Sequence, residues 1–507
     1  MPDLTRWKTK LHLMPPTGWL NDPNGLCQFH GVYHVFFQYR PEDAFGGGNT
    51  CWGHYTSPDL LHWTFQGTPL LPDHPFDKNG VYSGSALTDK NSLFLFYTGN
   101  VKQPGDFDYI RAGREANVVL VPSPDGMEFG KKELLLSNDS YPADCTCHVR
   151  DPKAWRDGDD YYMLLGARLR KSRKTNQTTE HPDASPSCDY GGVLLYHSKD
   201  CRRWDYHSTI TTPDSFGYMW ECPDAFVVDG IPLLSISPQG LKRESHRFQN
   251  VYQSGYFVIN GELTKNCVLS EFREWDMGFD FYAPQTFLDE KGRRILIGWM
   301  GLPDIEKEYK NPTTEDGWQH VLTIPRELYA SKAGVICQRP VPELEALRGT
   351  KHIIPDGGRI QTAAPFDLLV CPAHAKEEAG DTVITLYDSL QIRCSLSKGE
   401  YSMEFVSGPS RKERPSNPLM QSPGYGRTIR RAAIPATSAG ISPAPDGIPA
   451  SPGQIRIICD TSAVEVFFGD GETVMSTRIY PDPKSPAFVS VKGGTGCLWE
   501  MEGLEIK

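Results

Sequence analysis

The sequence lacks apolar runs long enough to cross a membrane, and it lacks an excess of basic residues. Its longest apolar runs, such as residues 295–300, have the length of one strand rather than the roughly 18 residues of a spanning helix. The formal net charge of the 507 residues is −11, which disfavours binding to nucleic acid or to an anionic membrane surface. We therefore expect neither a membrane nor a nucleic acid as a partner.

Signals for export, for disulfide frameworks and for metal sites are also missing. Residues 1–10 contain no apolar stretch and no small-residue cleavage site, so we expect a cytoplasmic protein. The 13 cysteines are scattered and odd in number, which is typical of reduced thiols. Cys145, Cys147 and His148 lie close together but do not have the spacing of a zinc site. We expect no metal and no other cofactor.

The chain is instead rich in strand and turn residues. Aromatic residues make up 11% of the sequence, beside 47 glycines and 41 prolines, and this mixture favours strands joined by tight turns. Long apolar stripes with helical spacing are hard to find. The composition therefore predicts an all-β protein.

Five segments repeat one plan: a proline or glycine is followed by a short apolar stretch, a polar turn and a second apolar run. Aligned on Pro23, Gly84, Pro152, Pro223 and Pro284, they are spaced by 61, 68, 71 and 61 residues. Such a period is typical of a β-propeller with four-stranded blades, and a large sandwich with coincidental turns is the alternative. We predict a five-bladed β-propeller in residues 1–330.

A second repeat lies between these segments. Residues 57–63, 123–129 and 198–204 all read Ser-x-Asp-x-x-x-aromatic. A Ser-x-Asp turn followed by an aromatic side chain that packs back on it suits a hairpin at the edge of a blade.

The repeats end near Arg326, and the pattern then changes. Residues 338–348 resemble a linker that runs into a short helix. Period-2 alternation follows at 381–387 and 454–459, which indicates an antiparallel sandwich with a long loop at 422–453. We expect a linker at 331–348 and a C-terminal β-sandwich domain at 349–507.

Three carboxylates occupy equivalent places in the propeller repeats. The first strand of each blade lines the central channel, so equivalent positions of the repeats converge. The two positions before the aligned residues hold Asn21 and Asp22, Tyr82 and Ser83, Arg150 and Asp151, Glu221 and Cys222, and Tyr282 and Ala283. Asp22, Asp151 and Glu221 should therefore meet in one pocket with Asn21, Tyr82, Arg150 and Tyr282.

Crowded carboxylates raise the pKa of at least one member, and one protonated with one ionised carboxyl is what retaining glycoside hydrolysis needs. The simpler interpretation is that Asp22 and Asp151 only cap turns beside proline, as aspartate often does. The coincidence of carboxylates across three repeats favours a catalytic pocket.

The motifs around these carboxylates resemble glycoside hydrolase family 32. Residues 19–25 with Gln38, residues 150–153 and residues 221–223 resemble its three signatures, and residues 52–54, 82–85 and 323–327 also fit, in the family's order. The match extends over nearly the whole chain. The resemblance implies a five-bladed propeller followed by a β-sandwich, which agrees with the count of repeats.

The resemblance also implies roles. Asp22 would be the nucleophile, Glu221 the general acid/base, and Asp151 would stabilise the transition state by holding fructose hydroxyls. The implied reaction is retaining hydrolysis of terminal, non-reducing β-D-fructofuranosides by double displacement. The residues expected to bind the sugar are Asn21, Gln38, Trp52, Ser83, Arg150, Tyr282 and Trp299.

Several alternatives remain open at this point. The substrate is a small sugar: sucrose, sucrose 6-phosphate or short fructo-oligosaccharides. The same scaffold also serves fructosyltransferases, while a non-catalytic fructan-binding propeller is expected to lack one of the three carboxylates. The basic run at 168–174 is either a solvated hairpin or a phosphate contact. A homo-oligomer is possible through an exposed edge of the sandwich.

Overall fold

The computed structural model describes residues 6–89, 91–170, 189–303, 311–373, 380–407, 428–435, 453–482 and 487–507. These residues form strands almost throughout, and the only helices among them are the short 3-10 turns η1 (Asn138–Ser140), η3 (Pro312–Asp316) and η4 (Pro342–Leu347). None of the described helices has the length and apolar character needed to span a membrane. The all-β class predicted from composition is confirmed.

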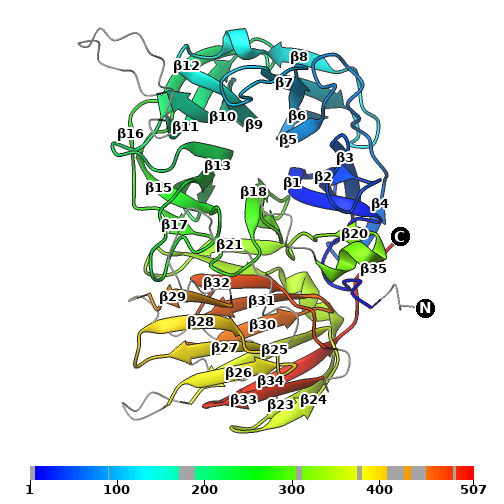
Figure 1. The fold of residues 1–507 in the computed structure, drawn as a ribbon, viewed down its shortest axis with the longest axis vertical. Helices are drawn as coiled ribbons and strands as arrows, with labels where there is room; N and C mark the ends of the chain where they lie inside the picture. Colours follow the sequence, from blue (N-terminus) through cyan, green and yellow to red (C-terminus); the bar gives the residue numbers. More distant parts are fainter. Residues whose placement is uncertain are drawn as a thin grey trace.

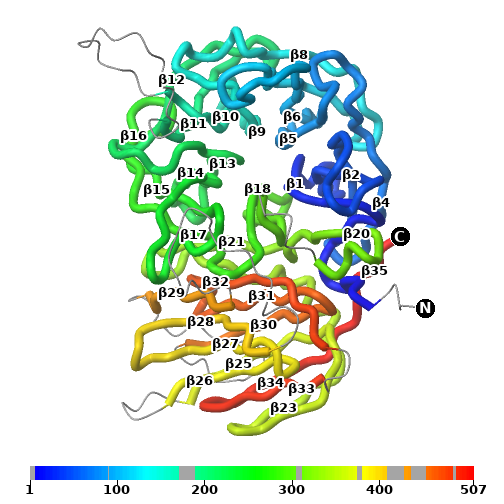
Figure 2. The backbone as a smooth tube through the Cα atoms, viewed as in Figure 1, coloured from blue at the N-terminus to red at the C-terminus, as the bar shows by residue number. Residues whose placement is uncertain are grey.

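Five sheets are arranged around a common centre in the N-terminal part of the chain, and the first strand of each sheet lies innermost (Figures 1 and 2). The first sheet has the order β20 (Trp318–Gln319), β1 (Gly18–Phe29), β2 (Val32–Arg40), β3 (Cys51–Ser57), β4 (His62–Phe65) and β35 (Glu505–Ile506). The second contains β5 (Val81–Asp89), β6 (Ser92–Lys102), β7 (Arg114–Ser123) and β8 (Glu133–Leu136), and the third β9 (Cys145–Asp157), β10 (Asp160–Arg170), β11 (Asp189–Ser198) and β12 (Asp205–Ile210). The fourth contains β13 (Met219–Val228), β14 (Ile231–Gln239), β15 (Gly255–Gly261), β16 (Cys267–Leu269) and β17 (Arg273–Glu274), and the fifth β18 (Tyr282–Leu288), β19 (Arg294–Trp299), β21 (Arg326–Ala330) and β22 (Ile336–Pro340). This is the propeller that the repeats predict.

The Ser-x-Asp repeat forms the same turn in three sheets, between the third and the fourth strand. Ser57 Oγ accepts a hydrogen bond from the Leu60 amide at 2.8 Å, and Asp59 Oδ1 accepts one from the next amide at 2.9 Å. The same acceptors serve the same turn positions at 123–128 and 198–203. Side-chain acceptors that replace backbone partners explain why Ser and Asp recur there.

Segments distant in sequence complete the first sheet. β20 pairs in parallel with β1, and β35, at the C-terminal end, pairs in parallel with β4. In the fifth sheet β22 pairs with β21, so the segment expected to be a linker at 331–348 contributes an outer strand followed by η4. The division of the chain at 330 and 348 stays a prediction.

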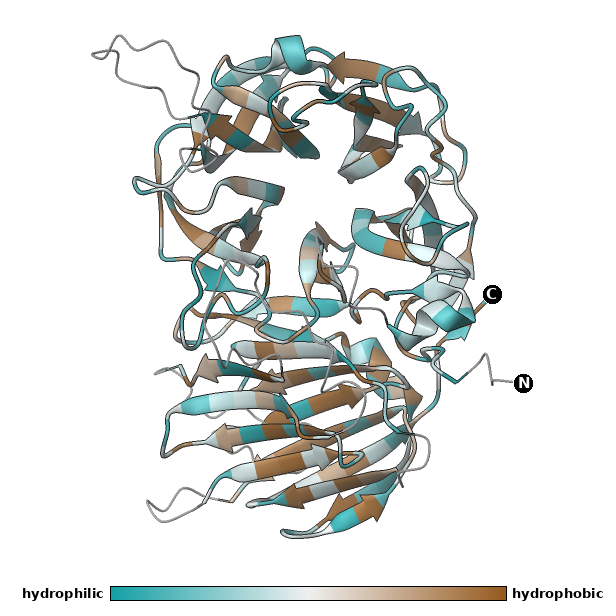
Figure 3. Cartoon of the chain, viewed as in Figure 1, coloured by the Kyte–Doolittle hydropathy of each residue, from teal (hydrophilic) through white to brown (hydrophobic). Residues whose placement is uncertain are grey.

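The C-terminal part is a sandwich of two six-stranded sheets. One sheet has the order β23 (Arg348–Ile354), β34 (Gly494–Met501), β25 (Phe366–Pro372), β30 (Ile455–Cys459), β31 (Ala463–Phe468) and β32 (Thr473–Arg478). The other has the order β24 (Arg359–Gln361), β33 (Phe488–Lys492), β26 (Thr382–Leu386), β27 (Leu390–Ser395), β28 (Glu400–Phe405) and β29 (Ile429–Ala433). Hydrophobic and hydrophilic residues alternate along strands such as β27 (Figure 3), as the period-2 pattern predicts. Most of the long loop predicted at 422–453 lies outside the described residues.

A buried network of charges joins the sandwich to the propeller. Arg326 of β21 donates from Nε to Glu465 Oε2 of β31 at 2.7 Å and from Nη2 to Asp276 Oδ2 at 3.1 Å. His12 lies between Asp460 and Glu465, with Nδ1–Oδ2 and Nε2–Oε1 distances of 2.8 and 3.0 Å. All five side chains are buried away from water. Each charge therefore depends on its partners in the network for the stabilisation that water would otherwise provide.

This network makes stability depend on pH. Burial lowers the pKa of His12, but hydrogen bonds and the charges of Asp460 and Glu465 outweigh it and raise the pKa to about 9. A raised pKa means that protonated His12 stabilises the fold fully below its ordinary pKa of 6.5, and that this stabilisation is lost as pH rises through 9. We expect the free energy of unfolding of the wild type, relative to His12→Gln, to fall by about 3 kcal/mol from pH 6 to pH 9.5. Urea unfolding of both proteins measures it, and a difference that does not change with pH would contradict the assignment.

Candidate active site

A cavity of about 270 Å³ lies where one end of the inner strands β1, β5, β9, β13 and β18 converges. Nine of the ten predicted site residues line it, namely Asn21, Asp22, Gln38, Ser83, Arg150, Asp151, Glu221, Tyr282 and Trp299. Five further residues complete the lining, namely Trp19, Arg40, Tyr82, Cys222 and Pro303. The alignment of repeats therefore brings the three carboxylates together, as expected.

Irregular pairing aims these side chains into the cavity. Each inner strand shifts register against the second strand of its sheet at the repeat position of the carboxylates: between Leu20 and Pro23 in β1, and between Glu221 and Asp224 in β13. The shifts in β5, β9 and β18 occur at the equivalent positions. A bulge of this kind bends the strand and re-aims a side chain. Asp151 has a left-handed φ of 64°, which is uncommon outside glycine and places its carboxylate in the pocket.

Asp22 is held by neighbours from three strands. Ser83 Oγ donates to Asp22 Oδ2 at 2.5 Å, and Asn21 Nδ2 donates to Oδ1 at 3.0 Å. Gln38 Nε2 lies 3.4 Å from Oδ2 and also contacts Ser83. Burial raises the pKa of Asp22 above its ordinary value, although the hydrogen bonds from Ser83 and Asn21 oppose the rise. These donors fix the orientation of both carboxylate oxygens.

Glu221 has the densest set of polar contacts. Gln239 Nε2 and the Tyr282 hydroxyl donate to Glu221 Oε2 at 2.8 and 2.7 Å. Its other oxygen, Oε1, lies 3.5 Å from Arg150 Nη1 and 3.6 Å from His148 Nε2. Burial raises the pKa of Glu221, but His148 and Arg150 outweigh burial and bring the pKa to about 2. Glu221 is therefore ionised in the free site.

Asp151 has a pKa close to neutral. Its Oδ2 accepts a hydrogen bond from the Cys222 amide at 2.9 Å. Burial raises the pKa of Asp151 to about 7; Arg150 opposes the rise, whereas Glu221 and Asp22 add to it. The pKa is thus raised in Asp22 and Asp151, as the sequence predicts for at least one member, mainly by burial and to a smaller extent by the neighbouring carboxylates, whereas the pKa of Glu221 is lowered.

Trp52, expected to bind the sugar, does not reach the cavity. Its side chain is fully buried between the first two sheets, and its Nε1 donates to the Tyr82 carbonyl at 3.1 Å. It supports the strand that carries Tyr82 and Ser83 rather than lining the pocket. Trp299 does line the cavity, 6.2 Å from Trp19 between ring centroids.

Sequence reasoning missed Trp19, Arg40, Pro303 and the Glu221 partners His148 and Gln239. Alternate residues of a strand share a face, and this signal could have found three of them. Trp19 lies two residues before Asn21, His148 two before Arg150, and Arg40 two after Gln38. Pro303 and Gln239 have no such signal.

The basic run at 168–174 is only partly described. Arg168 is buried, pairs with Asp189 at 2.7 Å, and lies 4.7 Å from the centroid of the Tyr218 ring. Arg111 joins the same carboxylate at 2.8 Å. Residues 171–174 lie outside the described residues. Arg168 is therefore engaged within the protein rather than solvated.

Comparison with known proteins identifies relatives along the whole chain. The chain is 37% identical to sucrose-6-phosphate hydrolase of Bacillus subtilis over 484 residues, which covers 93% of this chain and 88% of the relative. It is 35% identical to raffinose invertase of Escherichia coli, covering 98% and 95%. Among solved structures, sucrose-6-phosphate hydrolase from Lactobacillus gasseri superposes with a TM-score of 0.81 at 26% identity, covering 99% and 94%.

Family models match both parts of the chain. The N-terminal domain of glycosyl hydrolases family 32 matches residues 12–181 and 182–340, and the C-terminal domain of that family matches residues 418–501. Since these matches include the five sheets that enclose the carboxylates, the chain belongs to glycoside hydrolase family 32.

Proposed function

We propose that this enzyme is a retaining β-fructofuranosidase in which Asp22 is the nucleophile and Glu221 the general acid/base. The observation that carries the proposal is the convergence of Asp22, Asp151 and Glu221 on one cavity from three different sheets. Asp22 attacks the anomeric carbon of fructose while Glu221 protonates the leaving oxygen. Water then releases fructose from Asp22, with Glu221 acting as the base. The names of the relatives, a sucrose-6-phosphate hydrolase and an invertase, support this reaction.

Glu221 needs a proton when the leaving group departs, whereas it is ionised in the free site. We propose that substrate binding raises the pKa of Glu221, so that it is protonated before the leaving group departs. A sugar that fills the cavity excludes water from Glu221, and its hydroxyls compete for the Arg150 guanidinium that lies 3.5 Å away. Both effects raise the pKa of Glu221 toward neutral pH. The low pKa returns when the product leaves.

Glu221→Gln tests the acid role, because glutamine keeps the shape of the side chain but cannot transfer a proton. We expect kcat for sucrose to fall roughly 10²–10⁴-fold. An aryl fructofuranoside with a good leaving group needs less protonation, so its rate of fructosyl transfer to the enzyme should fall much less. Rapid-quench kinetics with both substrates measure this, with thermal unfolding as the check of folding. Near-wild-type turnover, or equal losses with both substrates, would contradict the role.

Asp151 should set the basic limb of the pH profile of kcat/KM. We propose that the ionised carboxylate accepts hydrogen bonds from fructose hydroxyls and stabilises the positive charge that develops on the sugar. The reaction needs one proton on Glu221, and the free site holds one proton, on Asp151, only below the Asp151 pKa of about 7. kcat/KM should therefore fall as pH increases through 7. Asp151→Asn should have low activity and lack this limb. A wild-type profile that is flat between pH 6 and pH 8 would overturn the assignment.

Two arginines near the cavity favour a phosphorylated substrate. Arg40 lines the cavity. Arg114 begins β7, and the loop before β7 contacts β9, where the Ile110 carbonyl accepts a hydrogen bond from the Cys147 amide at 2.8 Å. Neither forms an ion pair with a described residue, and Arg114 Nε is buried without a hydrogen-bond partner in that part of the chain. Burial and the charge of Arg150 lower the pKa of Arg114 to about 10. A phosphate group would satisfy such cations. We therefore propose sucrose 6-phosphate as the preferred substrate.

Measured side by side, kcat/KM for sucrose 6-phosphate should exceed that for sucrose by tenfold or more, a difference of about 1.4 kcal/mol. Arg114→Gln should remove most of this preference by slowing the phosphorylated substrate, because one charged hydrogen bond to phosphate is lost. Arg111→Gln is the matched control, since Arg111 already pairs with Asp189. Equal losses on both substrates in Arg114→Gln would exclude the phosphate contact.

The names of the relatives, a hydrolase and an invertase, favour hydrolysis over fructosyl transfer as the reaction of this enzyme. A cytoplasmic location and a homo-oligomeric state stay predictions.

A further inference from the structure

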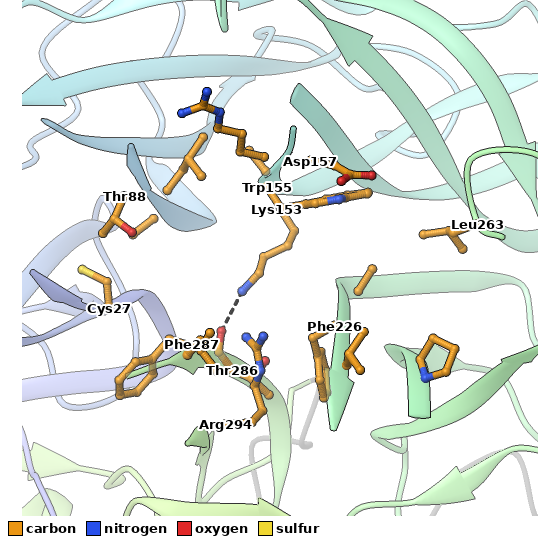
Figure 4. A pocket seen from close by; sticks show the side chains of 18 of the residues that line it. Cys27, Thr88, Lys153, Trp155, Asp157, Phe226, Leu263, Thr286, Phe287 and Arg294 are labelled. Carbon is orange, nitrogen blue, oxygen red and sulfur yellow. Dashed lines mark hydrogen bonds between the residues drawn. The ribbon is translucent and has the colours of Figure 1, made fainter. Parts of the chain in front are cut away.

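A second cavity, of about 540 Å³, lies further along the same inner strands (Figure 4). Every first strand contributes to it beyond its active-site residues: β1 at 26–28, β5 at 86–88, β9 at 153–157, β13 at 225–227 and β18 at 286–288. At about 3.3 Å per residue, the two cavities are separated by roughly 7–13 Å along the strands. The channel of the propeller thus has a pocket at each end, and the mechanism above uses one of them.

The wall of this cavity carries more positive than negative charge. Lys153 is buried and reaches across the space, where its Nζ donates to the Thr286 carbonyl at 2.8 Å and lies 3.1 Å from Asp224 Oδ2 (Figure 4). Asp224 is fully buried and also accepts hydrogen bonds from the Thr286 amide and hydroxyl at 2.8 and 2.9 Å. Lys153 and Asp224 therefore neutralise each other.

Arg294 is the cation that remains. It lines the cavity from β19, and its guanidinium lies 5.1 Å from the centroid of the Phe226 ring. It forms no ion pair with a described residue, and its Nε is buried without a hydrogen-bond partner in the described part of the chain. A buried Nε–H group without a hydrogen-bond partner is costly, so a bound anion that accepts its hydrogen bond would stabilise it. Arg156 lines the same cavity but already pairs with Asp89 at 2.5 Å.

The remaining wall suits a ring rather than a bare ion. Trp155, Phe226 and Phe287 present aromatic surface, and Leu263 adds an aliphatic side chain (Figure 4). The volume is about twice that of the active-site cavity and within the range of pockets for small organic ligands. Asp157 and Glu262 provide carboxylates that can accept hydrogen bonds from the hydroxyl groups of a ligand.

We propose that this cavity is a second ligand site, which binds a phosphorylated monosaccharide. The phosphate contacts Arg294 and Lys153, the sugar ring packs on Trp155, and the hydroxyls face the carboxylates of Asp157 and Glu262. The observation that decides for an anion is Arg294 with its buried, unpartnered Nε, and the aromatic wall decides for a sugar ring.

The test is calorimetric titration with glucose 6-phosphate, inorganic phosphate and glucose. Glucose 6-phosphate should bind more tightly than either fragment, and Arg294→Gln should weaken it by tenfold or more. Arg156→Gln, the matched control, should stay within about threefold because Asp89 already compensates Arg156. Arg294→Lys, which keeps the charge, should retain part of the affinity and guards against a folding defect.

Binding of the same probe at the active-site cavity is distinguished by the number of sites. A second molecule of glucose 6-phosphate bound there would remain in Arg294→Gln and be lost in Arg114→Gln. Unchanged affinity in Arg294→Gln, or no binding besides the site that Arg114→Gln removes, would overturn the proposal. Inorganic phosphate that binds as tightly as glucose 6-phosphate would reject the sugar and leave a simple anion site.

Discussion

The structure depends on one irregularity repeated five times. Each inner strand of the propeller carries an extra residue at the same level, and in the first four repeats two adjacent positions line the cavity. In a regular strand adjacent residues point to opposite faces, and only one of the two would reach the cavity. The bulge explains how Asn21 with Asp22, and Arg150 with Asp151, line the same space. It also holds three carboxylates together against their mutual repulsion.

The electrostatics of the site follow from this geometry. Arg150 lies close to Glu221, and His148 approaches the same oxygen, so these groups lower the pKa of Glu221 while burial raises that of Asp151. The free site consequently keeps its proton on a carboxyl that is not the proposed acid. A substrate that displaces Arg150 and water changes this order, so that the protonation needed for catalysis forms only when the cavity is filled. In the absence of sugar, Glu221 is therefore ionised and cannot protonate a leaving group.

The repeats predict the propeller and most of the pocket because both depend on one periodic position of the chain. Prediction fails where a contact depends on side-chain orientation or on loops. Trp52 lies in β3, paired with Gln38 of the cavity lining, yet its indole packs in the core between two sheets. Pro303 comes from outside the repeat. The pairing of Lys153 with Asp224 joins two sheets at the far end of the channel, and no sequence pattern announces it.

The two ends of the channel differ in charge although the same strands build them. Near one end Asp22, Asp151 and Glu221 crowd around Arg150, while near the other Lys153 pairs with Asp224 and Arg294 lines the cavity without an ion pair to a described residue. β9 contributes to both, since Asp151 and Lys153 are separated by one proline. The Pro152 carbonyl accepts a hydrogen bond from Ser85 of β5 at 2.7 Å, which fixes the peptide between them. Asp151 and Lys153 therefore belong to one fixed stretch of β9, and two neighbouring side chains of a single strand serve the opposite ends of the channel.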